Sequence, residues 1–204
     1  MKKLQTILAL VCVTAFISGC GKSSGRLKLA FVSNNTANFW NYARAGCDAA
    51  AKQLGNVDVD FRLPASGSAA EQTQILNDLV AGGVNGIAVS VDDPANETAL
   101  LNKIASQTLL ITTDSDAPKS KRVCYIGTDN VAAGVQVGDM IKECLPHGGK
   151  IMMFVGHIDA QNAVERVEGI KKAIKGSNIQ ILDIRTDDTD AARAQKNAED
   201  TLVK

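Results

Sequence analysis

Short apolar runs alternate with helical patterns of apolar residues from residue 27 to the end of the chain. Short runs bounded by polar turn residues are typical of buried strands, whereas apolar residues at every third or fourth position are typical of helices. The expected strands are 27–32, 57–63, 86–91, 109–112, 122–127, 150–155 and 179–184, and the expected helices are 39–54, 69–81, 97–106, 130–145, 160–174 and 190–204. This alternation predicts an α/β protein with parallel sheets, helices on both sheet faces and right-handed crossovers.

The N-terminus has the pattern of a targeting signal. A short basic start precedes an apolar stretch, residues 4–17, that is too short to span a bilayer comfortably. Ile17-Ser18-Gly19-Cys20 then resembles the end of a bacterial lipoprotein signal, in which the cysteine is acylated and becomes the first mature residue. We therefore expect a signal peptide over 1–19 and a lipid-bearing tether over 20–26 that holds the protein to a membrane outside the cytoplasm. A generic signal peptide cut at about the same place is the alternative.

Charge and motifs exclude several classes of function. The chain carries 22 basic and 22 acidic residues, and a balanced charge argues against nucleic acid as a partner. His147 and His157 stand apart, and no cysteine–histidine spacing is typical of a metal site, so we expect no metal and no cofactor. The sequence contains no G-x-S-x-G, P-loop or H-E-x-x-H motif, which predicts that the protein is not an enzyme.

The expected mature chain contains three cysteines after Cys20, namely Cys47, Cys124 and Cys144. An oxidising compartment outside the cytoplasm permits disulfides. Cys124 begins an expected strand and Cys144 ends the following helix, so a helix that runs back antiparallel would bring the two cysteines close together. A bridge between Cys124 and Cys144 is one alternative, and buried free thiols are the favoured one.

The loop after the first expected strand is the first candidate for ligand binding, because ligands of open α/β sheets bind at the carboxyl ends of the strands. Residues 33–36 are Ser-Asn-Asn-Thr, and the next helix opens with Phe39 and Trp40. An aromatic pair beside hydroxyl and amide side chains suits a ligand with one apolar face and many hydroxyls, which describes a sugar. The alternative is that Phe39 and Trp40 belong to the core face of an amphipathic helix.

Charged residues follow other expected strands. Asp114 ends a buried strand, where a half-desolvated carboxylate needs hydrogen-bond donors such as sugar hydroxyls. Asp92 and Asp93 precede a proline and are more typical of helix caps than of ligands. Arg166 lies in the helix expected over 160–174, where a charge exposed to solvent is the alternative to a functional role.

Five motifs in this order resemble the periplasmic binding proteins of the ribose and allose type. They are the lipoprotein signal at Cys20, Ser33 with Phe39-Trp40, Ile111-Thr-Thr-Asp114, Gly127-Thr-Asp-Asn130 with Gly134 and Gly138, and Glu165-Arg166-Val-Glu-Gly169. The resemblance covers residues 27–204 and implies two Rossmann-like lobes joined by a three-strand hinge. It also implies that a sugar is held in the cleft and delivered to an ABC permease with its ATPase.

The resemblance assigns roles to particular residues. It implies that Phe39 and Trp40 stack on the sugar ring, that Asp114 holds ring hydroxyls, and that Arg166 reaches across the cleft from the second lobe. Ser115 stands where ribose binders have an arginine, so a different sugar or a polyol is an open alternative to ribose. The candidate ligand-binding residues are Ser33, Asn34, Phe39, Trp40, Asp114, Ser115 and Arg166.

The same resemblance divides the chain into an N-terminal sugar-binding lobe over 27–128 and a partial second lobe over 129–204. The last expected helix reaches Lys204 without a cap, which predicts that the chain stops inside the second lobe. The expected partners are a monosaccharide, the permease and the membrane through the lipid anchor alone, with the protein a monomer. Two alternatives stay open: a sensing receptor for a chemotaxis or kinase partner, and the core of a LacI-type regulator, which would need an N-terminal DNA-binding helix-turn-helix.

Overall fold

The computed structural model describes residues 25–202, so the expected signal peptide and Cys20 lie outside the described residues. The elements in chain order are β1 (Leu27–Val32), α1 (Trp40–Leu54), β2 (Val57–Arg62), α2 (Ala69–Ala81), β3 (Gly86–Val89), α3 (Pro94–Ala105), β4 (Leu109–Thr113), β5 (Tyr125–Ile126), α4 (Asn130–Cys144), β6 (Gly149–Val155), α5 (Gln161–Ile174), β7 (Ile179–Thr186) and α6 (Ala191–Leu202). Strands and helices alternate except that β5 follows β4 directly, and the predicted α/β class with parallel sheets is confirmed.

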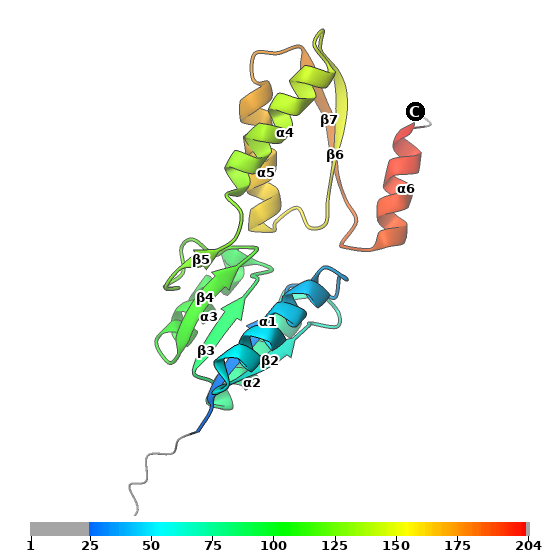
Figure 1. The fold of residues 1–204 in the computed structure, drawn as a ribbon. Coiled ribbons are helices and arrows are strands. Elements are labelled where there is room, and N and C mark those ends of the chain that lie inside the picture. The colour runs from blue at the N-terminus through cyan, green and yellow to red at the C-terminus, as the bar shows by residue number, and fades with distance from the viewer. Residues whose placement is uncertain (1–24, 203–204) are drawn as a thin grey trace, which may run out of the picture.

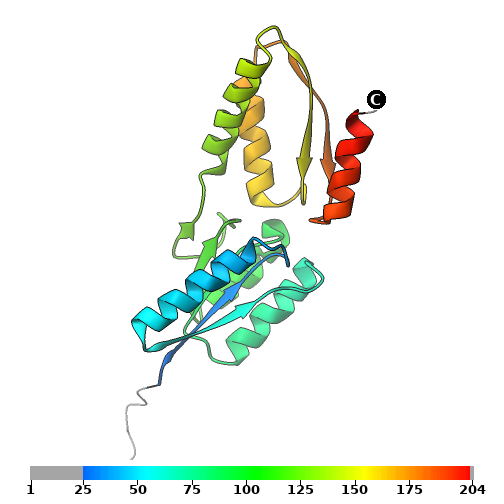
Figure 2. The same cartoon turned by 45° about the vertical axis from the view of Figure 1, so that its right-hand side comes forward.

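The first sheet has five parallel strands in the order β2-β1-β3-β4-β5. Its main core forms where the short apolar strands meet α2 and α3, with Val32, Val89, Leu76, Leu101 and Leu110 removed from solvent. Helix α1 covers the opposite face (Figures 1 and 2). This arrangement directs the carboxyl ends of the first strands towards the second sheet, because parallel strands all end at the same edge.

The second sheet consists of the parallel strands β6 and β7, with α4 and α5 on one side and α6 on the other (Figure 2). The backbones of helices α4 and α5 are in direct contact at two glycines. A Cβ atom added to Gly134 would lie 2.2 Å from the carbonyl oxygen of Arg166, and one added to Gly169 would lie 2.3 Å from that of Val131. Because glycine alone fits at such contacts, Gly134 and Gly169 fix how α5 and its Arg166 sit against α4.

Helix α4 leads away from the first sheet instead of returning along it. The chain passes from β5 through residues 127–129 into α4, whose far end lies at the opposite end of the second sheet (Figure 1). The expectation that Cys124 and Cys144 lie close together is therefore wrong. Within the described residues Cys47, Cys124 and Cys144 are free thiols, as favoured, but Cys124 and Cys144 are exposed and Cys47 is half-buried, so their expected burial is also wrong.

Three expected strands are shorter in the structure. Strand β2 ends at Arg62 and not at residue 63. The strand expected over 122–127 is reduced to β5, although Val123 N–H still donates to the Leu110 carbonyl oxygen at 2.8 Å and Thr112 N–H to that of Cys124 at 3.1 Å. Strand β3 stops at Val89 and not at residue 91. Beyond Val89 the chain bonds to the loop that follows β4, with Val91 N–H donating to the Ser115 carbonyl oxygen at 3.1 Å.

Candidate functional site

A cavity of about 250 Å³ lies where strand ends of the two sheets face each other. Its lining from the first sheet and α1 is Asn34, Asn35, Ala37, Phe39, Trp40 and Asp114, and its lining from the second is Gly156, His157, Ala160, Asn162, Ala163 and Thr189. The volume is below that of most drug-sized sites, which begin at about 300 Å³, and so suits a small ligand. Four predicted site residues therefore line one cavity: Asn34, Phe39, Trp40 and Asp114.

The loop after β1 is held by its own side chains. Asn35 Oδ1 accepts hydrogen bonds from the Ala37 N–H and from Trp40 Nε1, both at 2.9 Å, and Asn35 Nδ2 donates to Asn34 Oδ1 at 2.8 Å. The Ser33 hydroxyl donates to the Asn35 carbonyl oxygen at 2.7 Å. Ser33 is fully buried and does not line the cavity, so its contacts are those of a residue that shapes the loop. An asparagine whose side chain accepts from the N–H two residues further on is typical of a turn, and an asparagine in a polar loop before a helix is a signal that could have identified Asn35.

The two aromatic residues are exposed to different extents. Trp40 is 3% exposed and packs against Phe31 and Phe39, with ring centroids 5.9 and 5.2 Å apart. Phe39 is 59% exposed, and its ring is the open apolar surface at the cavity. The burial of Trp40 fits the alternative of a core residue, while Phe39 offers the face that stacking on a sugar requires. The binding role of both residues stays a prediction.

Asp114 has an unusual backbone and a partly desolvated side chain. Its φ angle is 60°, a left-handed conformation that residues other than glycine seldom adopt. The carboxylate accepts a hydrogen bond from the Ser90 hydroxyl at 2.9 Å. Burial raises the pKa of the Asp114 carboxyl, although the bond from Ser90 and the charge of Arg166 act in the opposite direction. Ser90 was missed by the sequence analysis, yet a polar residue at the end of an apolar strand is a recognisable signal.

Ser115 and Arg166 do not line this cavity. Ser115 is fully buried, and its hydroxyl has no hydrogen-bond partner among residues 25–202. Arg166 lines a neighbouring hollow of about 600 Å³ beside α4, α5 and β6, which shares Gly156, Asn162 and Ala163 with the cavity. Its Nε donates to Asn130 Oδ1 at 2.8 Å, and this bond keeps the guanidinium at the first turn of α4.

The second sheet contributes polar residues that lie at candidate strand ends but were not among the predicted ligand-binding residues. His157, Asn162 and Thr189 all line the cavity. The Nε2 atom of His157 is buried and has no partner in the described part of the chain, while its Nδ1 lies 3.9 Å from Asp188 Oδ1. Their signal was available, because His157 and Thr189 follow expected strands, in loops that also contain Asp159, Asp187 and Asp188.

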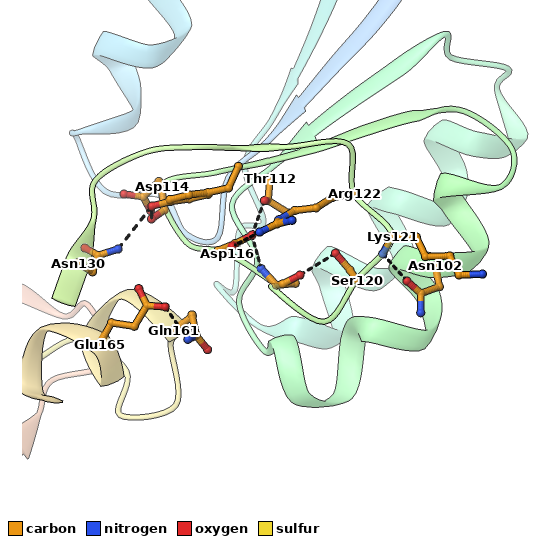
Figure 3. A network of polar contacts seen from close by, with 12 residues as sticks. Asn102, Thr112, Asp114, Asp116, Ser120, Lys121, Arg122, Asn130, Gln161 and Glu165 are labelled. Atoms are coloured by element: carbon orange, nitrogen blue, oxygen red, sulfur yellow. Dashed lines mark hydrogen bonds and ion pairs between the residues drawn. The ribbon is translucent and has the colours of Figure 1, made fainter. Parts of the chain in front are cut away.

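A second polar network lies next to the cavity and fixes the segment after β4 (Figure 3). Asp116 accepts hydrogen bonds from Thr112 Oγ1 at 2.5 Å, from Arg122 Nη2 at 2.6 Å and from the Ala117 N–H at 2.7 Å. Burial acts to raise the pKa of the Asp116 carboxyl, but the bonds from Arg122 and Thr112 hold it below its usual range. The ionised Asp116 thus ties both ends of the 112–122 segment together, two residues beyond Asp114.

The site offers hydrogen bonding and no evident covalent chemistry. Carboxylate, amide, hydroxyl and imidazole groups surround a small cavity with one exposed aromatic face. Such a set matches a neutral ligand with several hydroxyl groups. Over residues 25–202, no group of three metal-ligating side chains is arranged to hold a metal ion. The helices of that same range include none long and apolar enough to cross a membrane.

Comparisons with known proteins agree with this arrangement. A family model for the periplasmic binding protein domain matches residues 29–204. The chain is 27% identical over 207 residues to the ribose import binding protein RbsB of Haemophilus influenzae, covering 100% of this chain and 69% of that protein. A solved ABC transporter solute-binding protein of Burkholderia graminis in complex with D-arabinose is 30% identical, with a TM-score of 0.83 over 89% of this chain and 63% of that one. GanP, a glucose-galactose binding protein of Geobacillus stearothermophilus, is 29% identical, with a TM-score of 0.79 over 86% and 64%.

A polar cavity between the strand ends of two parallel sheets is the arrangement of an α/β protein that binds small molecules. More particularly, the chain belongs to the periplasmic binding protein family, because the family model covers residues 29–204. The predicted resemblance to the ribose and allose type is confirmed by the matches to ribose import binding proteins. The chain spans 61–69% of the length of the curated relatives it matches.

Proposed function

We propose that the protein captures a monosaccharide outside the cytoplasm, between two lobes, and delivers it to an ABC permease. The observation that carries the proposal is the cavity that places the exposed Phe39 ring and the Asp114 carboxylate on one side and His157, Asn162 and Thr189 on the other. An aromatic face and hydrogen-bonding groups match the two kinds of surface that a sugar presents. The names of the similar proteins, which include binders of ribose, D-arabinose and glucose-galactose, support the same ligand class.

The lobes in this proposal are residues 27–128 and 129–204, which correspond to the two sheets and the helices packed on them. Ligand capture then consists of drawing groups from both lobes onto one sugar. Membership of the periplasmic binding protein family supports an extracytoplasmic location. Docking on a sensory partner in place of a permease uses the same capture step and is the second candidate.

The proposal is tested by isothermal titration of the purified protein with D-ribose, D-arabinose, D-galactose, D-glucose, D-fructose and glycerol. We expect at least one sugar to bind, and Asp114→Asn to weaken that sugar about tenfold or more, because the amide lacks the charge that strengthens bonds from hydroxyls. Asp139→Asn, which changes an exposed aspartate of α4, is the matched control and should leave affinity unchanged. Equal loss in both variants, or no binding of any sugar in the panel, would contradict the proposal.

Lipid attachment at Cys20 is proposed separately, from the Ile17-Ser18-Gly19-Cys20 pattern that follows an apolar stretch. Mass spectrometry of the membrane fraction should find the mature protein beginning at an acylated Cys20. Cys20→Ala should release the protein from the membrane. An unmodified cysteine, or a variant that fractionates like the wild type, would show that the protein is not lipidated.

A further inference from the structure

A chain of hydrogen bonds joins Asp114 to Arg166 across the connection between the two sheets. Arg166 Nε donates to Asn130 Oδ1 at 2.8 Å, Asn130 Nδ2 donates to the Tyr125 hydroxyl at 3.4 Å, and that hydroxyl donates to the Asp114 carbonyl oxygen at 2.8 Å. Figure 3 shows Asn130 reaching from the start of α4 towards Asp114. The two charged residues predicted to hold a ligand are thus connected through Tyr125 and Asn130.

The direction of each bond follows from the chemistry of the groups. A guanidinium has only donors, so Asn130 must turn its carbonyl oxygen to Arg166 and its NH₂ group to Tyr125. A hydroxyl that accepts from Asn130 has one proton left to donate, and the nearest acceptors are the carbonyl oxygens of Asp114, at 2.8 Å, and Thr128, at 3.1 Å. Burial raises the pKa of the Tyr125 phenol, so the proton needed for this bond is present at neutral pH.

Asn130 depends on Tyr125 because it is 3% exposed. A buried amide without partners carries a large desolvation cost, so its orientation is set by the groups that bond to it. Among the described residues, the acceptor for Asn130 Nδ2 is the Tyr125 hydroxyl, at a distance near the upper limit for a hydrogen bond. Removal of that hydroxyl frees the amide to rotate, and rotation breaks its bond to Arg166.

On the other side, Tyr125 supports the strained backbone at Asp114. The Asp114 N–H donates to the Ile126 carbonyl oxygen at 3.2 Å, and its carbonyl oxygen accepts from Tyr125, so the left-handed residue is held at both ends of its backbone. Gly127 makes room for this contact, because a Cβ atom there would lie 2.2 Å from the Tyr125 hydroxyl oxygen. The ring therefore folds back over the chain only when residue 127 has no side chain.

We propose that Tyr125 and Asn130 are positioning residues, which hold the Asp114 backbone and the Arg166 guanidinium in a fixed relation before a ligand binds. Neither residue lines the cavity, so both act through Asp114 and Arg166. The predicted effect on affinity rests on the proposed sugar-binding function, whereas the hydrogen bonds from which the proposal is argued do not.

The first test needs no ligand. Tyr125→Phe removes one oxygen atom, and Tyr42→Phe removes the same atom from a tyrosine that is 80% exposed, which makes it the matched control. Hydrogen exchange of the Arg166 Nε–H, measured by ¹⁵N NMR and assigned with Arg166→Lys, should be at least fivefold faster in Tyr125→Phe and unchanged in Tyr42→Phe. Equal exchange rates in the two variants would overturn the proposal, whatever the protein binds.

The second test uses D-arabinose as the probe in isothermal titration. Tyr125→Phe should weaken binding about tenfold, and the same change in an Arg166→Lys background should weaken it clearly less, because only the contact with the Asp114 carbonyl oxygen is then left to lose. A tenfold loss in both backgrounds would identify a merely structural effect and overturn the proposal. If the wild type does not bind D-arabinose, that result counts against this sugar, and the exchange rate of Arg166 alone decides the positioning role.

Discussion

Glu97 makes the stability of the protein depend on pH in a direction opposite to that of most carboxylates. It lies in the first turn of α3 and is 3% exposed. Its Oε2 accepts from the Asp93 N–H at 3.0 Å, while its Oε1 has no partner within residues 25–202. Burial raises the pKa of this carboxyl from 4.5 to about 7, the charges of Asp92 and Asp93 add to the increase, and the backbone hydrogen bonds oppose it.

The sign and size of the effect follow from linkage. Between the unfolded and folded pKa values the folded protein holds a proton that the unfolded chain has released, so stability falls as pH rises through this window and is level above it. A shift from 4.5 to about 7 corresponds to about 3 kcal/mol at 1.36 kcal/mol per pKa unit, of which about 2.5 kcal/mol is lost between pH 5 and pH 8. For a chain of this size, that loss lowers Tm by roughly 5–10 °C.

Glu97→Gln removes the titration and keeps an oxygen for the Asp93 N–H. Thermal unfolding followed by circular dichroism at pH 5 and pH 8 should show the variant equal to the wild type at pH 5. At pH 8 the variant should be more stable by about 2.5 kcal/mol, because the wild type then buries a charge that glutamine lacks.

The control is Glu143→Gln, which neutralises an exposed glutamate in the last turn of α4 and should leave the difference between the two pH values unchanged. Burial also raises the pKa of the Asp114 carboxyl, but this residue is present in both wild type and variant, so the comparison between them isolates Glu97. The reasoning is refuted if Glu97→Gln retains the full loss of stability between pH 5 and pH 8.

Two further comparisons test packing and ligand contact. Gly134→Ala should lower Tm markedly, because its Cβ would lie 2.2 Å from the Arg166 carbonyl oxygen, whereas Gly46→Ala, with nothing within 4 Å, should stabilise α1 by about 0.5–1 kcal/mol. Equal effects of the two substitutions in thermal unfolding would contradict the close contact between α4 and α5. Phe39→Ala should weaken sugar binding about tenfold with little change in Tm, since an aromatic face contributes about 1–3 kcal/mol when covered. Trp40→Ala should lower stability by about 3–5 kcal/mol, and an unchanged Tm would refute its place in the core.

The sequence was sufficient for the elements and their class because apolar periodicity is a local property. The expected helix 69–81 agrees with α2 in both bounds, since Ser68 caps its first turn and Gly82 follows its last. Strand β1 is likewise as expected over 27–32. The short length of β5 was not predictable, because the apolar pattern of residues 122–127 does not show which of them meet β4 in a regular ladder.

The sequence could predict that the site lies at the carboxyl ends of strands, but not how its side chains are arranged. The sequence identified Asp114 and the aromatic pair, but it could not show that Trp40 turns inward while Phe39 stays open, since the two are adjacent at the start of the same helix. The resemblance placed the helix expected over 130–145 in the second lobe, but the residues alone left open a return of that helix beside its strand, and with it the alternative of a bridge between Cys124 and Cys144. The positioning role proposed for Tyr125 depends on the hydrogen bond from its hydroxyl to the Asp114 carbonyl oxygen, a contact that the sequence does not show.

The glycine contact between α4 and α5 has a mechanical consequence. Arg166 lies opposite Gly134, the fifth residue of α4. At a rise of 1.5 Å per residue, Gly134 is roughly 6 Å along the helix from the 127–129 connection. If the second sheet and its helices turn about that connection, a rotation of about 10° moves Arg166 by roughly 1 Å, while the far end of α4, roughly 20 Å along, moves more than three times as far. Arg166 therefore lies near the axis of such a rotation, where a given change of angle displaces it less than it displaces the far end of α4.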